Sequence, residues 1–373
     1  MKILINASNL KVGGGLQVAD SIVHELKNLP EHSYIAVVPS RIFDDCLDAN
    51  SDGVKVLKYD MPASFIAAIT GKDSMLDNLV VNEGVDAVLT VFGPSRWRPK
   101  VPHLCGFARP QLVIPESPFW ENVKGVQRLE SCFKKVINRW LFKVGTDNLW
   151  TENSFISDRV KRLYPQKKVF TVTNNYNQVF DDENLWDNSI KLPAWDGLTL
   201  LTISANYSHK NLEIIRPCIE WLRAHYPELK CRFVLTLNEK QFPLHNDAEK
   251  EHIVLIGQVS INQVPNLYRQ ADVMFLPTLL ECFSASYAEA MKMKVPILTT
   301  DLGFAHSICC DAACYYLPTS VSDLGERIYS LATDHALSQN IVDNGLRQLE
   351  HFDTAAQRAR KLIDITSNLA KKR

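Results

Sequence analysis

Short runs of apolar and β-branched residues alternate with helical stretches along almost the whole chain. This alternation predicts parallel β-sheets with crossover helices, because parallel strands need a long return connection. In the first half the strand candidates are Lys2–Ala7, Tyr34–Val38, Ala87–Phe92, Leu104–Phe107, Asn148–Glu152 and Val169–Thr173. In the second half they are Leu198–Ser204, Arg232–Leu237, Ile253–Ile256, Val273–Leu276, Pro296–Thr300 and Cys314–Leu317. About six strands in each half predict an α/β fold of two doubly wound parallel sheets.

The domain organisation follows from length and composition. A chain of 373 residues suits two cores, and the stretch 174–195 is rich in Asn and Asp and poor in periodic apolar residues. We expect an N-terminal domain over residues 1–175, a linker over 176–195 and a C-terminal domain over 196–353. The last helix, within 354–373, is expected to pack back on the N-terminal domain. Ligands should bind in the cleft at the carboxyl ends of the strands.

Composition excludes several classes of protein. The formal net charge is −1, from 41 basic and 42 acidic residues, which gives no reason to expect a nucleic-acid partner. No apolar run approaches the roughly 18 residues of a membrane span, and the N-terminus is typical of a strand rather than a signal peptide. The nine cysteines include no CxxC pair and are expected to be buried. A cytoplasmic location is therefore expected.

Residues 275–291 form the segment most informative about function. A strand ends near Pro277 and a helix is expected to begin near Phe283, with Ser284 and Ser286 as capping candidates. Free amides at this helix start, near Phe283, Ser284 and Ala285, and the helix dipole would bind an anion.

Two carboxylates accompany this anion site. Glu289 suits a ribose diol, because an ionised carboxylate only accepts hydrogen bonds. Glu281 precedes the amides and would meet the other end of the same ligand. By spacing alone, two surface carboxylates on a solvated helix are the commoner explanation.

A second loop supplies a positive charge. Lys210 follows a strand and a polar loop that contains Ser204 and His209, and it is expected to open a helix. Its ammonium group would add a point charge to backbone amides around a diphosphate. The alternative is an ordinary exposed lysine on a helix.

These segments together resemble one family. Glu281 and Glu289 form an E-x7-E pattern that continues into Ala290-Met291. Two runs lie upstream of this pattern: Ile256-Gly257-Gln258-Val259, and then L-Y-x-x-A-D, which ends at Asp272. With the Lys210 loop, this pattern resembles the family 4 glycosyltransferases of bacterial surface polysaccharides over most of residues 198–335. The resemblance implies a GT-B fold of two Rossmann-like domains. It also implies retaining transfer of a hexosyl-type sugar from a nucleoside-diphosphate sugar to a sugar or lipid-linked glycan acceptor.

The resemblance also assigns residues. Glu281, Lys210 and Arg109 are the expected catalytic residues; Arg109 is included because it stands at the C-terminal end of a strand and could bind a phosphate, not because of the resemblance. The expected donor-binding residues are Gly14, Gly15, Ser204, His209, Lys210, Gln258, Glu281, Phe283, Ser284, Ala285 and Glu289. The glycines belong to a loop after the first strand, for which a plain flexible turn is the alternative. No metal or other cofactor is expected, because the sequence has no D-x-D motif and Lys210 with helix amides would neutralise the leaving diphosphate.

The chain departs from the family pattern at several places. Ala108 and Arg109 stand where many relatives have His-Asp, and His103 precedes the strand, where a structural role is expected. Where the family usually has Arg before the Lys, this chain has residues 205–208 of sequence ANYS, and Ser307 replaces a family Glu. Two alternatives therefore stay open: a nucleotide-sugar epimerase of the same fold, and a non-catalytic nucleotide-sugar-binding subunit.

Residues 124–144 predict a basic amphipathic helix. Apolar residues recur at helical spacing, and basic residues such as Lys134, Lys135 and Arg139 occupy other positions. Such a helix can rest on an anionic membrane, so peripheral contact with its inner face is one interpretation. The commoner interpretation is an apolar stripe that faces the core, with a solvated basic face.

Overall fold

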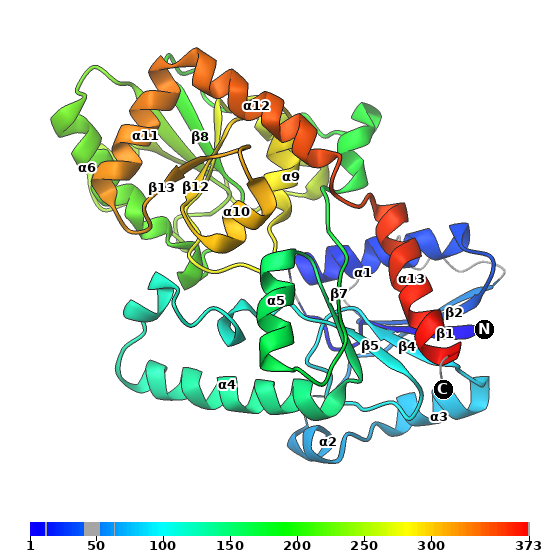
Figure 1. Cartoon of the computed structure of the whole chain (residues 1–373). Coiled ribbons are helices and arrows are strands. Elements are labelled where there is room, and N and C mark those ends of the chain that lie inside the picture. The colour runs from blue at the N-terminus through cyan, green and yellow to red at the C-terminus, as the bar shows by residue number, and fades with distance from the viewer. Residues whose placement is uncertain (12, 41–52, 63, 372–373) are drawn as a thin grey trace. The chain divides into compact units, whose positions relative to one another are not determined.

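The computed structural model describes residues 1–11, 13–40, 53–62 and 64–371, which divide into two compact units (Figure 1). The first unit comprises Met1–Pro115, Lys124–Asn174 and Asp353–Arg373. The second unit comprises Glu116–Val123 and Asn175–Phe352. The residues expected as a linker thus cluster with the second unit, and the last helix clusters with the first.

The first unit is built on a seven-stranded parallel sheet. Its order is β3-β2-β1-β4-β5-β6-β7, so the direction of strand addition reverses between β1 and β4. The strands are β1 (Lys2–Asn6), β2 (Ser33–Val38), β3 (Val54–Lys58), β4 (Ala87–Thr90), β5 (His103–Gly106), β6 (Asn148–Thr151) and β7 (Val169–Thr171). The helices are α1 (Gly14–Glu25), α2 (Phe65–Thr70), α3 (Ser74–Glu83), α4 (Gly125–Gly145), α5 (Ser154–Leu163) and α13 (Ala355–Lys371).

Both faces of this sheet are covered, which explains why its central strands are apolar at successive positions. On one face, Ile3 and Ile5 pack with Ile22 of α1 and Leu362 of α13. On the other face, Leu4 packs with a second cluster that includes α3 and the buried Trp97. The C-terminal helix α13 lies against α1, and this contact completes the first core (Figure 1).

The second unit contains a six-stranded parallel sheet in the order β10-β9-β8-β11-β12-β13. Its strands are β8 (Leu198–Thr202), β9 (Cys231–Leu235), β10 (Ile253–Leu255), β11 (Val273–Leu276), β12 (Ile297–Thr300) and β13 (Cys314–Tyr316). Its helices are α6 (Ile215–His225), α7 (Asp247–His252), α8 (Val264–Tyr268), α9 (Ala285–Lys292), α10 (Gly303–Cys309), α11 (Val321–Thr333) and α12 (His335–Leu349). One core cluster joins α6 and α11 to the sheet, and α12 packs on α9.

All twelve expected strands are present, with shifts of one to two residues at their ends. The first sheet has seven strands rather than six, because β3 was not expected. In β3 the buried Val54 and Val56 flank the exposed Lys55, and the strand ends at the exposed Lys58. The strand pairs only with β2 at the sheet edge. An edge strand with lysines carries a weak apolar signal, which explains the omission.

Cap geometry defines the starts of two helices. Helix α5 begins at Ser154 and is capped by Asn153, whose side chain accepts the Ile156 N–H at 2.9 Å. Helix α9 begins at Ala285 rather than near Phe283, so Ser284 is its N-cap residue and Ser286 lies inside the helix.

Six of the eight described cysteines are buried, whereas Cys132 and Cys310 are exposed. Cys46 lies outside the described residues. In the part of the chain that the structure describes, no helix combines the length and apolar character needed to cross a bilayer.

Candidate functional site

The candidate site lies where strand order reverses in the second sheet, between β8 and β11. Loops that leave two such strands diverge to opposite faces and leave room for a ligand at the strand ends. Here the two loops are tied together. The Leu279 N–H donates to the His209 carbonyl at 2.8 Å, and the Thr278 hydroxyl donates to the same carbonyl at 3.3 Å. The β8 and β11 loops are therefore held in a fixed relation.

Lys210 and Glu281, one from each loop, form an ion pair. The Lys210 Nζ lies 2.5 Å from Glu281 Oε1, and the two side chains are 14% and 12% exposed. Thr278 Oγ1 donates to the same carboxylate oxygen at 3.1 Å. Lys210 ends a single 3-10 turn, η7 (Ser208–Lys210), followed by Asn211 with φ 53, so it does not open a helix as expected. A diphosphate brought to this loop would meet an ammonium group already positioned by a carboxylate.

Glu289 lies in the second turn of α9 and is buried, with 5% exposure. Tyr268, at the end of α8, donates its hydroxyl to Glu289 Oε2 at 3.2 Å. Burial raises the pKa of Glu289 to about 7, and the Tyr268 hydrogen bond acts in the opposite direction. A buried carboxylate near half-ionisation at neutral pH is typical of a site that gains a partner on binding.

The N-terminus of α9 leaves its amides available. Ser284 occupies the N-cap position with extended φ and ψ, but its side chain makes no capping hydrogen bond. The first-turn amides of a helix have no intrahelical acceptor. These amides and the positive end of the helix dipole can therefore accept an anion. Ser284 thus has the expected N-cap position without a capping hydrogen bond from its side chain, and Ser286 lies inside the helix rather than at its cap.

His209 contributes an imidazole that is largely enclosed. Burial is the main cause that lowers the pKa of His209, so the neutral form dominates at neutral pH. Tyr207 stacks on its ring, with centroids 5.6 Å apart, and Phe119 meets it edge to face at 6.4 Å. A neutral imidazole can donate a hydrogen bond to a sugar hydroxyl or accept one from it.

The segment Glu116–Val123 was not expected at this site. It clusters with the second unit, where the buried Ser117 donates its hydroxyl to the Leu279 carbonyl at 2.6 Å. Phe119 belongs to the 3-10 turn η4 (Pro118–Glu121) within this segment. Nothing in the sequence signals this contact, because the two partners are 162 positions apart. Thr278 and Tyr268 were also missed, although Tyr268 stands in the L-Y-x-x-A-D run.

Three other expected donor-binding residues, Ser204, Gln258 and Phe283, belong to the second unit. Ser204 follows β8, and its N–H donates to Thr236 Oγ1 at 3.0 Å. Gln258 follows β10 and is exposed. Phe283 packs edge to face on Phe352, with ring centroids 5.9 Å apart, so part of its role is structural.

Among the expected residues of the first unit, Gly14 and Gly15 follow β1, at the switch point of the first sheet, whereas Arg109 follows β5. Gly13, with φ 80, precedes α1, and a Cβ at Gly14 would meet nothing within 4 Å. A Cβ at Gly15 would make only ordinary van der Waals contacts. Packing therefore does not require a glycine at position 14 or 15. Arg109 is exposed and precedes the 3-10 turn η3 (Pro110–Leu112), three residues after β5.

His103 is a structural residue. It is buried in β5, its Nε2 lies 2.8 Å from Thr90 Oγ1, and its Nδ1 lies 3.2 Å from the Gly145 carbonyl. Burial lowers the pKa of His103 to about 4, so the ring is neutral at physiological pH. This imidazole is not available to a ligand.

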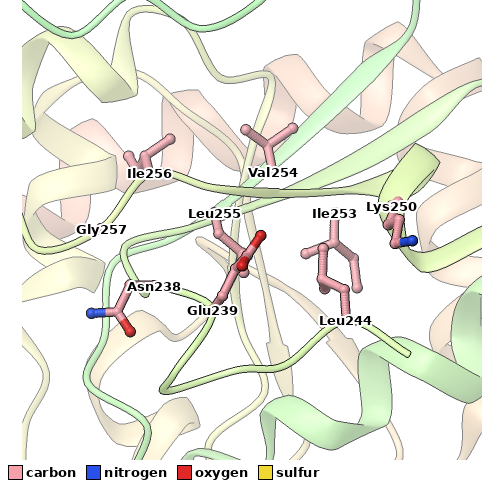
Figure 2. Close-up of a pocket in the computed structure, with 9 residues that line it drawn as sticks. All are labelled: Asn238, Glu239, Leu244, Lys250, Ile253, Val254, Leu255, Ile256 and Gly257. Carbon is pink, nitrogen blue, oxygen red and sulfur yellow. The ribbon is translucent and has the colours of Figure 1, made fainter. Parts of the chain in front are cut away.

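A separate pocket lies along β10, between the strand and the loop that follows β9 (Figure 2). In Figure 2 the polar side chains of Asn238, Glu239 and Lys250 accompany apolar side chains that include Leu244 and Leu255. None of the expected site residues lines this pocket. Among the described residues, no group of three or more His, Cys, Asp or Glu side chains could hold a metal ion.

Comparisons with known proteins bear on the family of the second unit and on the fold. Residues 196–348, which carry all of the site segments of the second unit except 116–123, match the family model described as Glycosyl transferases group 1. The chain is 22% identical over 201 residues to the O-antigen chain mannosyltransferase RfbU of Salmonella typhimurium. That match covers 51% of this chain and 53% of the relative, so it spans about half the length of each.

Solved structures resemble the chain over its full length. A glycosyltransferase from Rickettsia africae has a TM-score of 0.72 at 14% identity, covering 100% of this chain and 99% of that one. HepE of Anabaena, solved with UDP and glucose, has a TM-score of 0.65 at 13% identity, covering 99% and 100%. The chain thus has the GT-B fold, and residues 196–348 of its second unit are similar to the glycosyl transferases group 1 model.

Proposed function

We propose that this protein is a retaining glycosyltransferase that moves a hexosyl-type sugar from a nucleoside-diphosphate sugar to a hydroxyl acceptor. The observation that carries the proposal is the grouping of Lys210, Glu281 and the free end of α9 at the switch point of a group 1 domain. Glu289, on the same helix, would accept hydrogen bonds from the ribose hydroxyls of the nucleotide. HepE, with its UDP and glucose, supports a nucleotide-linked donor.

In the proposed reaction, the donor diphosphate binds to the Lys210 ammonium group and the first-turn amides of α9. These groups stabilise the negative charge that develops on the leaving diphosphate, which is the main electrostatic demand of the step. The bond between the sugar anomeric carbon and the diphosphate oxygen breaks. The acceptor oxygen bonds to that carbon on the same face, and its proton passes to the leaving phosphate. No metal ion is needed in this scheme, because Lys210 supplies the positive charge.

Glu281 has a second role in this scheme. It holds Lys210 in place before the donor arrives, and its free lone pairs can accept hydrogen bonds from the sugar hydroxyls. His209 and Ser204, from the β8 loop, lie in the segment that would face the same sugar. Arg109, Gly14 and Gly15 follow the β5 and β1 strands of the first unit, and we propose that they bind a phosphate or the acceptor there.

The proposed acceptor is a glycan, lipid-linked at the inner face of a membrane, in the assembly of a cell-surface polysaccharide. The O-antigen mannosyltransferase that resembles this chain supports that setting. An exposed apolar stripe on the basic helix α4 of the first unit also supports a membrane location.

One experiment separates this function from its alternatives. The protein is incubated with UDP-, GDP- and ADP-linked hexoses, with and without a panel of lipid-linked and free glycans, and products are assigned by NMR. We expect sugar transfer only with acceptor, with the anomeric configuration of the donor kept. Epimerised donor without acceptor would instead identify an epimerase. Donor binding without any product would identify a binding subunit, which the Ala108 replacement makes worth testing.

A further inference from the structure

Helix α4 carries an apolar stripe that no part of the described chain covers. Its members are spaced by three or four residues and therefore share one side of the helix. They are Val126 (81% exposed), Leu129 (73%), Phe133 (68%), Val136 (66%), Trp140 (41%) and Val144 (36%). The interpretation of this stripe as core-facing is therefore wrong. Only Leu141, Phe142 and Gly145, near the C-terminal end, are buried, and they anchor the helix to the first unit.

Positive charge borders this stripe. Between Lys124 and Gly145 the sequence has six basic residues and one acidic residue, although the chain as a whole has a net charge of −1. With 3.6 residues per turn, Arg128, Lys135 and Lys143 fall along one edge of the stripe. An exposed apolar stripe beside a basic edge is the pattern of a helix that lies in the plane of an anionic lipid surface.

Not every basic residue of α4 is available to a lipid. Arg139 donates a hydrogen bond to the Leu112 carbonyl at 2.8 Å, and Lys134 pairs with Glu130 at 2.6 Å. Arg128 and Lys143 have no hydrogen-bond or ion-pair partner among the described residues, and both are exposed. These two are the residues to test.

The apolar surface continues onto α2. Ile66 and Ile69 of this helix are 73% and 50% exposed. Arg98 links the two helices, because its guanidinium lies 5.1 Å from the Trp140 ring and donates to the Ile69 carbonyl at 3.2 Å. Figure 1 shows α2 beside the C-terminal end of α4. The exposed apolar residues thus form one surface supported by two helices.

We infer that this surface, which we call the α4 surface, docks onto an anionic lipid bilayer. A second copy of the chain fits less well, because pairing two α4 surfaces would bring like charges together. A bilayer with acidic headgroups accepts both features at once: the stripe enters the boundary of the acyl chains, and Arg128 and Lys143 meet phosphate groups. The inference deepens the proposed membrane location. It does not need glycosyl transfer, so the two proposals can fail separately.

The test is co-sedimentation of the full chain with vesicles. One set contains equal parts of phosphatidylglycerol and phosphatidylcholine, and the other contains phosphatidylcholine alone. We expect strong binding to the anionic set at low salt and much weaker binding to the neutral set. Binding should fall at high salt, because the distance over which charges interact shortens from about 10 Å at 0.1 M to about 3 Å at 1 M.

Two double variants test the two features of the α4 surface. We expect each double variant to lower the partition coefficient by tenfold or more. Arg128→Glu/Lys143→Glu should do so because each basic residue near an anionic surface contributes about fivefold. Leu129→Ser/Phe133→Ser should do so because it removes apolar area that would enter the bilayer. The matched controls are Leu317→Ser/Leu346→Ser and Lys191→Glu/Arg223→Glu, which change exposed residues of the second unit. The controls should bind as wild type. Circular dichroism melting checks that every variant is folded.

Three results would overturn the inference. Absence of sedimentation in every condition would leave α4 as a scaffold element. Equal binding of the wild type and both α4 variants would place the lipid contact elsewhere. A protein that is dimeric in solution, and that becomes monomeric in Leu129→Ser/Phe133→Ser, would show that a second copy covers the stripe.

Discussion

Two effects act in opposite directions on the protonation state of Glu289. Its burial favours the protonated form, whereas a ribose diol is best bound by an ionised carboxylate that accepts from both hydroxyls. Ionising Glu289 in the free protein therefore costs free energy, and hydrogen bonds from a bound nucleotide would offset that cost. The residue therefore links nucleotide affinity, stability and pH.

We predict a pH-dependent stability difference between the wild type and Glu289→Gln. The folded-state pKa, about 7, is raised above the ordinary value of 4.5. The folded state then holds its proton where the unfolded chain has released it. The Glu289 contribution to the free energy of unfolding is fully present below pH 4.5 and is lost as the pH rises through 7. Urea denaturation from pH 5 to 8 should show the variant gaining on the wild type by on the order of 2–3 kcal/mol. A constant difference across this range would contradict the account.

Lys210 provides the second residue-level prediction. Lys210→Ala should weaken nucleoside-diphosphate binding by a factor of about 10 to 100, because it removes a charge-assisted hydrogen bond worth about 1.5–3 kcal/mol. The matched control is Lys191→Ala, an exposed lysine of the same unit. Calorimetric titration measures both. Equal affinities of the two variants would remove Lys210 from the site.

At the scale of elements, the anion site combines a loop and a helix end. Neither Lys210 nor the α9 amides alone defines a diphosphate site, but the hydrogen bonds from Leu279 and Thr278 to the His209 carbonyl hold the two loops together. This coupling explains why Glu281 and Lys210, 71 positions apart, meet as a pair.

This arrangement predicts that activity survives metal chelation. If Lys210 and the α9 amides carry the charge of the leaving diphosphate, transfer measured in EDTA should stay within about twofold of the untreated rate. The control is a parallel reaction with added Mg²⁺, which should give no rescue. Complete loss in EDTA that Mg²⁺ reverses would show that a metal ion does this work.

The strands could be predicted from the sequence because buried parallel strands are continuous apolar runs, and twelve of thirteen were found this way. The α4 stripe was misjudged for a physical reason. Periodicity shows that Leu129, Phe133 and Val136 share a face, but it does not show what covers that face. The Lys210 and Glu289 segments were found through motif spacing. The Tyr268 and Ser117 contacts were not, because they join positions that only the folded chain brings together.

At the scale of the whole molecule, the chain divides its functions between two units. The second unit carries Lys210, Glu281 and Glu289 within the region that matches the group 1 model, and the first carries the α4 surface together with Arg109. The family match covers residues 196–348 and thus includes no residue of the first unit.

The measurement that tests the central claim most directly is calorimetric titration of the wild type, Glu289→Gln and Lys210→Ala with UDP, GDP and ADP at pH 8. We predict that the wild type binds one of these diphosphates in preference to the others, and that each variant binds the same nucleotide at least about tenfold more weakly. Circular dichroism should show that both variants stay folded. If the wild type binds none of the three, or if both variants bind with wild-type affinity, the switch point of the second sheet is not a nucleotide-sugar site.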